Sequence, residues 1–448
     1  MTRNAAPVEP PVVCTVAGSD SGGGAGVQAD LKTIEAGGGF GTSVLTSVTA
    51  QNTVGVESTH VLPVAEVRAQ AEAVFGDFDV AAVKTGMLAT APVVELVTER
   101  VAGFDGPAVV DPVMVAASGD RLLEPAAEDA YEALVEEATL VTPNADEAAV
   151  LTGVEVTDPE AAREAGEAVV DMGAGAALVK GGHVPGEQVV DVLVTEDTVE
   201  TLRHERVDTE ATHGSGCTLS SAIATRLAHG DSLAEAVRAG VDLLARAVRY
   251  NLDVGAGPGA VHHTVALRER AERGPTAERV EWLLRELTAR DLSPLVPEVG
   301  MNVVGATPYA ETPEECAAVE GRLTRTVDGV DSPRGVRFGA STHVAGALLA
   351  AREADADLRF AVNCRHDDAV AAALADLAGP VAEYDRDEYA DAADGEVTRQ
   401  GVAAAVEAAD GVPVAVVGRG GAKEPLVTLF APEARTLVER TERLLGAV

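Results

Sequence analysis

The chain has 448 residues, enough for two or three domains, and its 72 acidic residues outnumber 34 basic ones to give a formal net charge of −38. Because 46% of the residues are hydrophobic, we expect a folded protein with an acidic surface rather than a disordered chain. Such a surface repels phosphate backbones and anionic lipid heads, which argues against binding to nucleic acid or to membranes.

The basic residues are strongly biased towards arginine, with lysine only at positions 32, 84, 180 and 423. An excess of acidic residues, few lysines and 3% aromatic residues are typical of proteins that work in molar salt. There, dissolved ions screen the repulsion between the negative charges of the protein. The alternative is an acidic protein with a basic partner. Where lysine is nearly eliminated, each remaining lysine is expected to mark a site.

The four cysteines, Cys14, Cys217, Cys316 and Cys364, are widely spaced and form no CxxC pair. A disulfide framework or a structural zinc site is therefore not expected. The N-terminus lacks the apolar segment of a signal peptide, and no apolar run approaches the length of a membrane span. We expect a soluble, cytoplasmic protein.

Short β-branched runs alternate with helical Ala/Leu/Glu patterns through the first ~265 residues, which predicts a parallel α/β sheet. The predicted strands lie at residues 12–17, around 83, and at 108–110, 140–142, 176–179 and 189–193. The predicted helices lie at residues 27–36, 217–230 and 232–252.

A glycine/proline cluster at 255–259 and a charged run at 268–273 followed by Gly-Pro predict a domain boundary. Thr276 is expected to cap a helix whose apolar face consists of Val280, Leu283, Leu284 and Leu287. A second, smaller α/β domain is expected beyond it, with strands near 301–304, 359–362 and 414–417.

The first glycine-rich turn, "AGSDSGGGAGVQAD", follows a strand and precedes a helix, as in dinucleotide-binding folds. Gly22, Gly24 and Gly26 match that fingerprint only loosely. The next strand ends in Gln51 and Asn52 rather than in the acidic residue that binds a ribose. No glycine-rich stretch ends in Lys-Ser or Lys-Thr, so both the nicotinamide and the P-loop interpretations are disfavoured.

A second turn, "HGSGC", supports a different interpretation. The backbone N–H groups from Gly214 through Gly216 to Cys217, at a helix start, would form an anion-binding concavity for a phosphoryl group. Cys217 is placed to take a proton from an attacking hydroxyl, because a helix N-terminus lowers the pKa of a thiol. The alternative is that Cys217 is a small buried apolar residue.

Asn144 and Glu147 stand three residues apart after a predicted strand, and an amide with a carboxylate there suits Mg²⁺ near phosphates. A helix cap with a first-turn glutamate explains the pair equally well. Lys84 and Lys180 follow strands, where α/β sheets bind ligands. Lys32 lies inside a predicted helix, where a structural role remains open.

Seven segments together carry a resemblance: "AGSDSGGGAGVQADLKT", "VTAQNTVGV", "KTGML", "DPVMVAASGD", "TPNADEAAVLTG", "VKGGH" and "THGSGCTLSSAIA". Over residues 11–265 the chain resembles the hydroxymethylpyrimidine/phosphomethylpyrimidine kinases, which are ribokinase-like. The resemblance implies a three-layer α/β/α domain and two ATP-dependent phosphorylation steps. Sugar kinases of this superfamily usually have Asp where Cys217 stands, whereas vitamin kinases can use Cys.

The resemblance also implies roles for individual residues. Asp111 and Glu147 would hold Mg²⁺, and Lys180 would pair with an ATP phosphate, near Asn144 and Thr212. A homodimer is expected on the same basis. The residues implied for the pyrimidine pocket are Gly18, Ala25, Asp30, Gln51 and Met87.

In the second part, Arg322, His343 and Lys423 suggest a second site for an anionic substrate. A surface ion pair explains Arg322 alone, and a capping or core role explains His343 alone. Through "PEVGMNVV", "VEGR", "FGASTHVA", "AVNCR" and "KEP", residues 276–448 resemble the archaeal-type thiamine-phosphate synthase domain. This family joins hydroxymethylpyrimidine diphosphate to thiazole phosphate and releases pyrophosphate. Gly418 stands where the family often has Asp.

The leading hypothesis is a bifunctional thiamine-biosynthesis enzyme in which Arg322 and His343 stabilise the leaving diphosphate. One alternative is a kinase whose second domain senses thiamine phosphate. Another is a sugar or pyridoxal kinase with an inert tail, against which the "QADLKT" and "TAQNT" segments argue.

Overall fold

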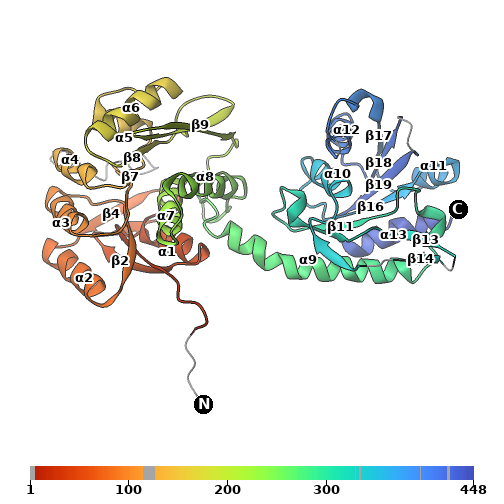
Figure 1. Ribbon diagram of the computed structural model, residues 1–448, viewed down its shortest axis with the longest axis horizontal. Coiled ribbons are helices and arrows are strands. Elements are labelled where there is room, and N and C mark those ends of the chain that lie inside the picture. The colour runs from red at the N-terminus through yellow and green to blue at the C-terminus, as the bar shows by residue number, and fades with distance from the viewer. Residues whose placement is uncertain (1–5, 115–126, 328, 332–333, 394, 421–423) are drawn as a thin grey trace, which may run out of the picture. The chain divides into compact units, whose positions relative to one another are not determined.

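The structure is a computed structural model, which describes residues 6–114, 127–327, 329–331, 334–393, 395–420 and 424–448. The chain divides into two compact units, Met1–Leu267 and Arg268–Val448. Each unit is described by itself (Figure 1).

Unit 1 contains a large sheet covered by helices. The strands of the large sheet are β1 (Val12–Ala17), β2 (Phe40–Leu45), β5 (Val80–Thr85), β6 (Ala108–Val110), β7 (Leu140–Val141), β8 (Ala176–Val179), β9 (Gln188–Thr195) and β10 (Val199–Glu205). A separate hairpin consists of β3 (Ser47–Gln51) and β4 (Val56–Val61). The helices are α1 (Gly26–Ala36), α2 (Val64–Asp77), α3 (Ala91–Ala102), α4 (Glu128–Glu136), α5 (Ala145–Thr152), α6 (Pro159–Asp171), α7 (Ser215–Ala228) and α8 (Leu233–Arg249).

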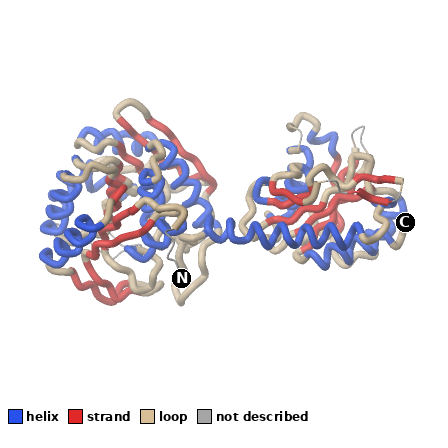
Figure 2. The backbone as a smooth tube through the Cα atoms, turned by 60° about the horizontal axis from the view of Figure 1, so that its bottom comes forward, coloured by secondary structure: helices blue, strands red, loops and turns tan. Residues whose placement is uncertain are grey.

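The eight strands follow the order β10-β9-β8-β7-β6-β5-β1-β2. From β8 to β2 neighbouring strands are parallel, as the alternating sequence pattern predicted, whereas β9 and β10 join as an antiparallel hairpin. Alternate residues of β1 enter different cores: Val13 packs with α1, α7 and α8, and Val16 with α2 and α3. The predicted three-layer α/β/α architecture is confirmed, with strands between layers of helices (Figure 2).

The two units divide between Leu267 and Arg268, at the start of the charged run of the predicted boundary, but a helix continues across this point. Helix α9 (Val265–Thr288) runs through the charged segment and contains Pro275. Within this segment Glu269, which is almost fully buried, accepts hydrogen bonds of 3.1 and 3.2 Å from Arg273 one turn later. Thr276 therefore does not cap a helix. Its hydroxyl accepts a hydrogen bond of 3.3 Å from Arg359 instead.

Unit 2 is built around a second sheet with the order β15-β12-β11-β16-β19-β18-β17. Its strands are β11 (Val303–Ala306), β12 (Cys316–Val319), β15 (Val336–Phe338), β16 (Phe360–Arg365), β17 (Val381–Asp385), β18 (Ala415–Arg419) and β19 (Leu426–Ala431), with a small hairpin of β13 (Thr324–Thr326) and β14 (Gly329–Asp331). The helices are α10 (His343–Arg352), α11 (Asp368–Ala375), α12 (Glu396–Glu407) and α13 (Ala434–Leu445), with short 3₁₀ turns at Ser293–Leu295, Pro313–Glu315 and Arg386–Tyr389.

One face of this sheet packs on α9, α11 and α13, and the other on α10 and α12. Three residues of the predicted apolar face of α9, Val280, Leu283 and Leu287, are fully buried, and Leu284 is partly buried against them. The three predicted strands of this unit correspond to β11, β16 and β18, and the expected second α/β domain is confirmed.

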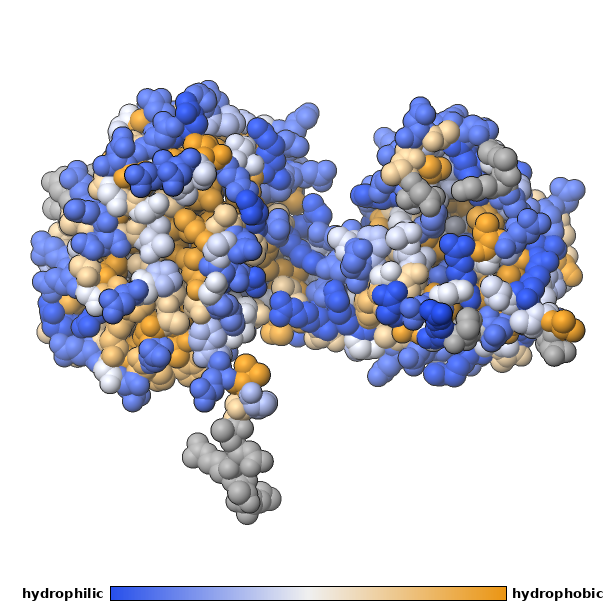
Figure 3. Space-filling view, viewed as in Figure 1, coloured by the Kyte–Doolittle hydropathy of each residue, from blue (hydrophilic) through white to orange (hydrophobic). Residues whose placement is uncertain are grey.

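Hydrophilic residues cover much of the visible face of each unit in Figure 3, in keeping with the acidic composition. No helix among the described residues is long and apolar enough to cross a bilayer.

Candidate active site

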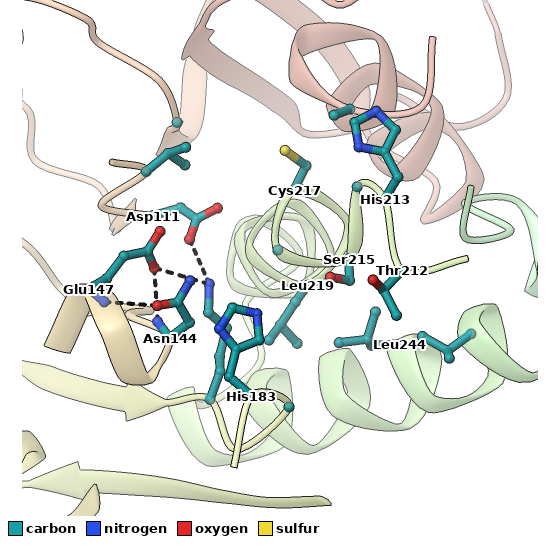
Figure 4. Close-up of a pocket in the computed structure, with 18 of the residues that line it drawn as sticks. Asp111, Asn144, Glu147, His183, Thr212, His213, Ser215, Cys217, Leu219 and Leu244 are labelled. Carbon is teal, nitrogen blue, oxygen red and sulfur yellow. Dashed lines mark hydrogen bonds and ion pairs between the residues drawn. The ribbon is translucent and has the colours of Figure 1, made fainter. Parts of the chain in front are cut away.

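A cavity of about 750 Å³ opens in unit 1 at the carboxyl ends of the central strands and the start of α7. Figure 4 shows part of its lining: Asp111, Asn144 and Glu147 gather on one side, with Cys217, Ser215 and Thr212 around the start of α7. Twelve of the residues predicted from the sequence line this one cavity: Gly18, Ala25, Gln51, Met87, Asp111, Asn144, Glu147, Lys180, Thr212, Gly214, Gly216 and Cys217. The structure thus brings together residues spread over two hundred positions of sequence.

The first glycine-rich turn is organised by Asp20, which is almost fully buried. Its carboxylate accepts the backbone N–H groups of Gly22, Gly24 and Ala25 at 2.8, 3.0 and 2.7 Å, and lies 3.0 Å from Nε2 of His213. Burial opposes ionisation, but the hydrogen bonds from His213 and these amides lower the pKa of Asp20. Asp20 therefore ties the first glycine turn to the turn before α7, a role that sequence reasoning missed.

The turn before α7 depends on a glycine. Gly214 has a φ of +81°, and a Cβ there would lie 1.8 Å from the carbonyl oxygen of Gly24. The N–H of Ser215 donates to the carbonyl of Thr212 at 3.1 Å, so it is not available to a ligand. The N–H groups of Gly216 and Cys217 belong to the first helical turn, which provides no intrahelical acceptor for them.

Cys217 is half-buried and lies in the first turn of α7. The expectation that the helix start lowers the pKa of this thiol is not what the structure shows. Burial raises the pKa of Cys217 to about 12, although the nearby ammonium of Lys84 acts in the opposite direction. The thiol is therefore neutral at ordinary pH in this structure.

Asp30 was expected to line the pyrimidine pocket, and the structure corrects this expectation. Its side chain is fully buried away from the cavity lining, with both carboxylate oxygens accepting hydrogen bonds from Lys84 at 2.8 and 2.9 Å. Thr15 and Ser221 donate to the same carboxylate at 2.6 and 2.9 Å. Because a buried carboxylate needs such partners, Asp30 serves as the counter-ion of Lys84.

The two predicted metal-binding carboxylates meet at Lys180. The ammonium of Lys180 lies 3.0 Å from Oδ1 of Asp111 and 3.7 Å from Oε2 of Glu147. Burial raises the pKa of Glu147. Although burial opposes it, the charges of Asp111 and Glu147 raise the pKa of Lys180. Among the described residues there is no cluster of three His, Cys, Asp or Glu side chains arranged to hold a metal.

Asn144 and Glu147 form the helix cap that was the alternative explanation for their spacing. Oδ1 of Asn144 accepts the N–H of Glu147, and Oε2 of Glu147 accepts the N–H of Asn144, each at 2.8 Å. The cap fixes the direction of the Glu147 side chain, which still borders the cavity. The structural and the site interpretations are therefore compatible.

The predicted pyrimidine end of the cavity contains Gly18, Gln51 and Met87. A Cβ at Gly18 would lie 2.3 Å from Cε of Met87, so only glycine leaves the methionine in place. The side-chain amide of Gln51 lies 3.4 Å from Nε2 of His213 and 3.4 Å from the hydroxyl of Thr49. Gln51 is thus held by weak contacts at the cavity wall.

In unit 2, Arg322 and His343 lie on separate elements. Arg322, between β12 and β13, has a φ of +66°, rare for a residue with a side chain, and it donates a hydrogen bond of 2.6 Å to the carbonyl of Val299. His343 begins α10, with Nδ1 3.3 Å from the hydroxyl of Thr342. Lys423 lies outside the described residues.

The structure accounts for Gly418, where an aspartate was expected by resemblance. Gly418 pairs with Tyr384 of the parallel neighbour β17, and a Cβ on it would lie 2.8 Å from the tyrosine ring. A Cβ on Gly401 would also lie 2.1 Å from that ring. Tyr384 therefore occupies the space that a side chain at position 418 would need.

Unit 1, with its eight-stranded sheet between helices and its cavity at the carboxyl ends of parallel strands, has the ribokinase-like fold. Residues 20–262 match the sequence model of the Phosphomethylpyrimidine kinase family, and residues 279–443 that of Thiamine-phosphate synthase ThiN. The chain belongs to the phosphomethylpyrimidine kinase family. It joins a hydroxymethylpyrimidine/phosphomethylpyrimidine kinase to a thiamine-phosphate synthase and is thus bifunctional in thiamine biosynthesis.

Three individual relatives each match somewhat more than half of the chain. The chain is 52% identical over 270 residues to a hydroxymethylpyrimidine/phosphomethylpyrimidine kinase of Streptomyces coelicolor, covering 60% of this chain and 100% of the relative. It is 44% identical over 263 residues to the thiamine biosynthesis bifunctional protein ThiED of Geobacter sulfurreducens, covering 58% and 54%. The ADP complex of Bacillus subtilis pyridoxal kinase superposes with a TM-score of 0.55 at 34% identity, covering 58% and 99%.

Proposed function

We propose that the cavity of unit 1 transfers the terminal phosphoryl group of ATP to the hydroxymethyl group of an aminopyrimidine, and then to the resulting monophosphate. The observation that carries this proposal is the single cavity shared by the Gly214–Cys217 turn, Lys180 and Gln51. The free N–H groups at the start of α7 suit the charge that grows on a transferring phosphoryl group. The amide of Gln51 offers the donor and the acceptor that an aminopyrimidine edge needs.

We propose Cys217 as the base that takes the proton of the attacking hydroxyl at Sγ. Only the thiolate can accept this proton, so the base role requires the thiol to lose its own proton first. The ammonium of Lys84 is the group in the chain that most favours the thiolate of Cys217. Asp30 in turn holds that ammonium in place.

We propose Asp111 and Glu147 as the residues that hold Mg²⁺. The donor set fits a bound cation, because both carboxylates already face one cation, the ammonium of Lys180. Carboxylates with ordered water suit this ion. When bound, Mg²⁺ neutralises charge on the nucleotide phosphates.

The predicted role of Lys180 follows from the same geometry. Its ammonium donates a hydrogen bond to Asp111 and forms an ion pair with Glu147, and we propose that it turns towards an anionic phosphate when a nucleotide binds. Asn144 and Thr212 border the same part of the cavity. For unit 2 we propose that Arg322 and His343 stabilise the diphosphate that leaves when thiazole phosphate is attached. The homodimer remains a proposal, which sedimentation equilibrium tests.

The kinase proposal is tested by measuring ATP-dependent phosphorylation of hydroxymethylpyrimidine by Cys217→Ala, with Cys316→Ala as the matched control. Cys316 is a buried cysteine of unit 2 and has no part in the cavity. We expect loss of at least ~100-fold in kcat for Cys217→Ala, the usual scale of a general base, and ordinary kcat for the control. A folded Cys217→Ala protein with full kcat would refute the assignment.

A further inference from the structure

Arg206, the residue after strand β10, closes a loop at one edge of the cavity. Its guanidinium donates three hydrogen bonds to backbone carbonyls of the segment 181–187: Nη1 to Gly182 at 2.9 Å, Nη2 to Val184 at 2.6 Å and Nε to Gly186 at 2.8 Å. Its backbone N–H donates to the carbonyl of Glu187 at 3.1 Å. One side chain thus fixes the course of most of this loop.

The beginning of the same loop is fixed from β9. Oδ1 of the buried Asp191 accepts the N–H of Gly181 at 2.8 Å, and Oδ2 of Asp191 lies 3.8 Å from Nε2 of His204. A Cβ on Gly181 would lie 2.1 Å from the carbonyl oxygen of Val190, so the backbone of the loop packs directly on the strand. The hairpin of β9 and β10 therefore anchors both ends of the segment 181–187.

The loop begins directly after Lys180, at the cavity wall. The N–H of Lys180 donates to the carbonyl of Pro143 at 2.9 Å, and the next N–H, that of Gly181, goes to Asp191. Both Asp191 and Arg206 border the cavity. A charge-assisted hydrogen bond is about twice as strong as a neutral one, so four such bonds firmly hold the backbone that follows the lysine.

Although the chain is strongly acidic, no carboxylate forms an ion pair with Arg206 among the described residues. Its partners in the structure are the carbonyl oxygens of one loop. Its positive charge is therefore not cancelled by a direct partner, at a cavity wall that Lys180 also lines. Together with Lys180, once its ammonium turns from Asp111 and Glu147 to a phosphate, this charge suits the polyphosphate of a nucleotide rather than a neutral pyrimidine.

We propose that Arg206 and Asp191 are positioning residues for the nucleotide: through loop 181–187 they set the place of Lys180 in the cavity. The proposal rests on the proposed function, in which Lys180 meets an ATP phosphate. Arg206 is half-buried and folds onto the loop rather than into the sheet. Its loss should therefore loosen the loop without unfolding unit 1.

The test is steady-state kinetics with ATP and hydroxymethylpyrimidine varied separately, using Arg206→Met, Arg206→Lys and the control Arg203→Met. Arg203 lies on β10, three residues before Arg206, and is exposed, so the control removes an equal charge without touching the loop. Arg206→Met is expected to raise the KM for ATP by about 10- to 100-fold, since a misplacement of ~1 Å in a site has that scale. The KM for the pyrimidine should change less than twofold, because Gln51 contacts Thr49 and His213, and Met87 lies against Gly18, rather than against this loop.

The KM for ATP of Arg206→Lys should lie between the values of wild type and Arg206→Met, because a lysine ammonium cannot bond to all three carbonyls at once. For Asp191, Asp191→Asn keeps an acceptor for Gly181 and should bind ADP more tightly in calorimetry than Asp191→Ala. Equal changes in both KM values, or an unchanged KM for ATP in a folded Arg206→Met protein, would overturn the proposal. A wild-type protein that phosphorylates no pyrimidine would instead refute the proposed function, so the two failures are distinguishable.

Discussion

Removing the ammonium of Lys84 should destabilise unit 1 strongly, because it leaves a charge buried without a counter-ion. In Lys84→Met, Asp30 keeps its hydrogen bonds from Thr15 and Ser221 but loses two bonds of 2.8 and 2.9 Å from the lysine. Neither side chain of the ion pair, Lys84 or Asp30, has any exposed surface. Breaking a buried pair by removing one partner costs about 3 to 5 kcal/mol, and we expect that loss.

The double variant Lys84→Met/Asp30→Asn separates this explanation from a loss of packing. With neither charge present no ion is left buried, so most of the lost stability should return. Lys32→Met is the control, since Lys32 is exposed and donates a single bond of 2.6 Å to the carbonyl of Gly23. Its effect should stay within about 0.5 kcal/mol.

The assay is urea unfolding in molar KCl, followed by circular dichroism and by tryptophan fluorescence. The single tryptophan, Trp282, packs against the core of unit 2, so its fluorescence reports on that unit. Lys84→Met should lower the urea concentration at which the dichroism signal of unit 1 is lost, and it should leave the midpoint of the fluorescence transition unchanged. A Lys84→Met protein as stable as Lys32→Met, or a double variant no better than Lys84→Met, would refute the reasoning.

Three other results are expected. Gly418→Asp should lower the melting temperature of unit 2 because its side chain collides with Tyr384, and adding Tyr384→Ala should recover it; an unchanged melting temperature in the single variant would contradict the packing. Burial raises the pKa of Glu147, so its carboxylate is protonated at a higher pH than usual. As the pH is lowered, the Mg²⁺ affinity measured by calorimetry should therefore begin to decrease at a pH above the ordinary glutamate range, and this decrease should be absent in Glu147→Gln. Burial raises the pKa of Cys217 to about 12, so the alkylation rate of ligand-free protein by iodoacetamide, followed by peptide mass spectrometry, should still rise about tenfold between pH 9.5 and 10.5. A rate that reaches its half-maximum near pH 8.5 and is constant above about pH 9.5 would show an ordinary thiol.

The sequence was sufficient where a local pattern determines the structure. Strands β1, β6 and β8 have the predicted bounds, because their runs of small and β-branched residues are buried on both faces of a parallel sheet. The convergence of the turn before α7, Asp111 and Lys180 in one cavity was also predictable, since all of them follow parallel strands or begin the helix beside them.

The sequence was insufficient where distant residues compete for the same space or the same charge. Nothing local to Asp30 shows that Lys84, 54 positions later, takes both of its oxygens. Likewise, Tyr384 and Gly418 meet only once β17 and β18 are paired. Pro275 was a misleading signal, since a helix tolerates one missing N–H when its other contacts hold.

The central claim, one chain that makes pyrimidine diphosphate and consumes it, is tested most directly by a one-pot assay. Wild-type protein in molar KCl receives Mg·ATP, hydroxymethylpyrimidine and thiazole phosphate, and thiamine phosphate is measured after oxidation to thiochrome. The account predicts thiamine phosphate with wild type, none with Cys217→Ala, and accumulated pyrimidine diphosphate with Arg322→Asn. Asparagine is chosen at position 322 because it tolerates the left-handed backbone conformation there. Pyrimidine diphosphate that accumulates with wild type, without thiamine phosphate, would contradict it.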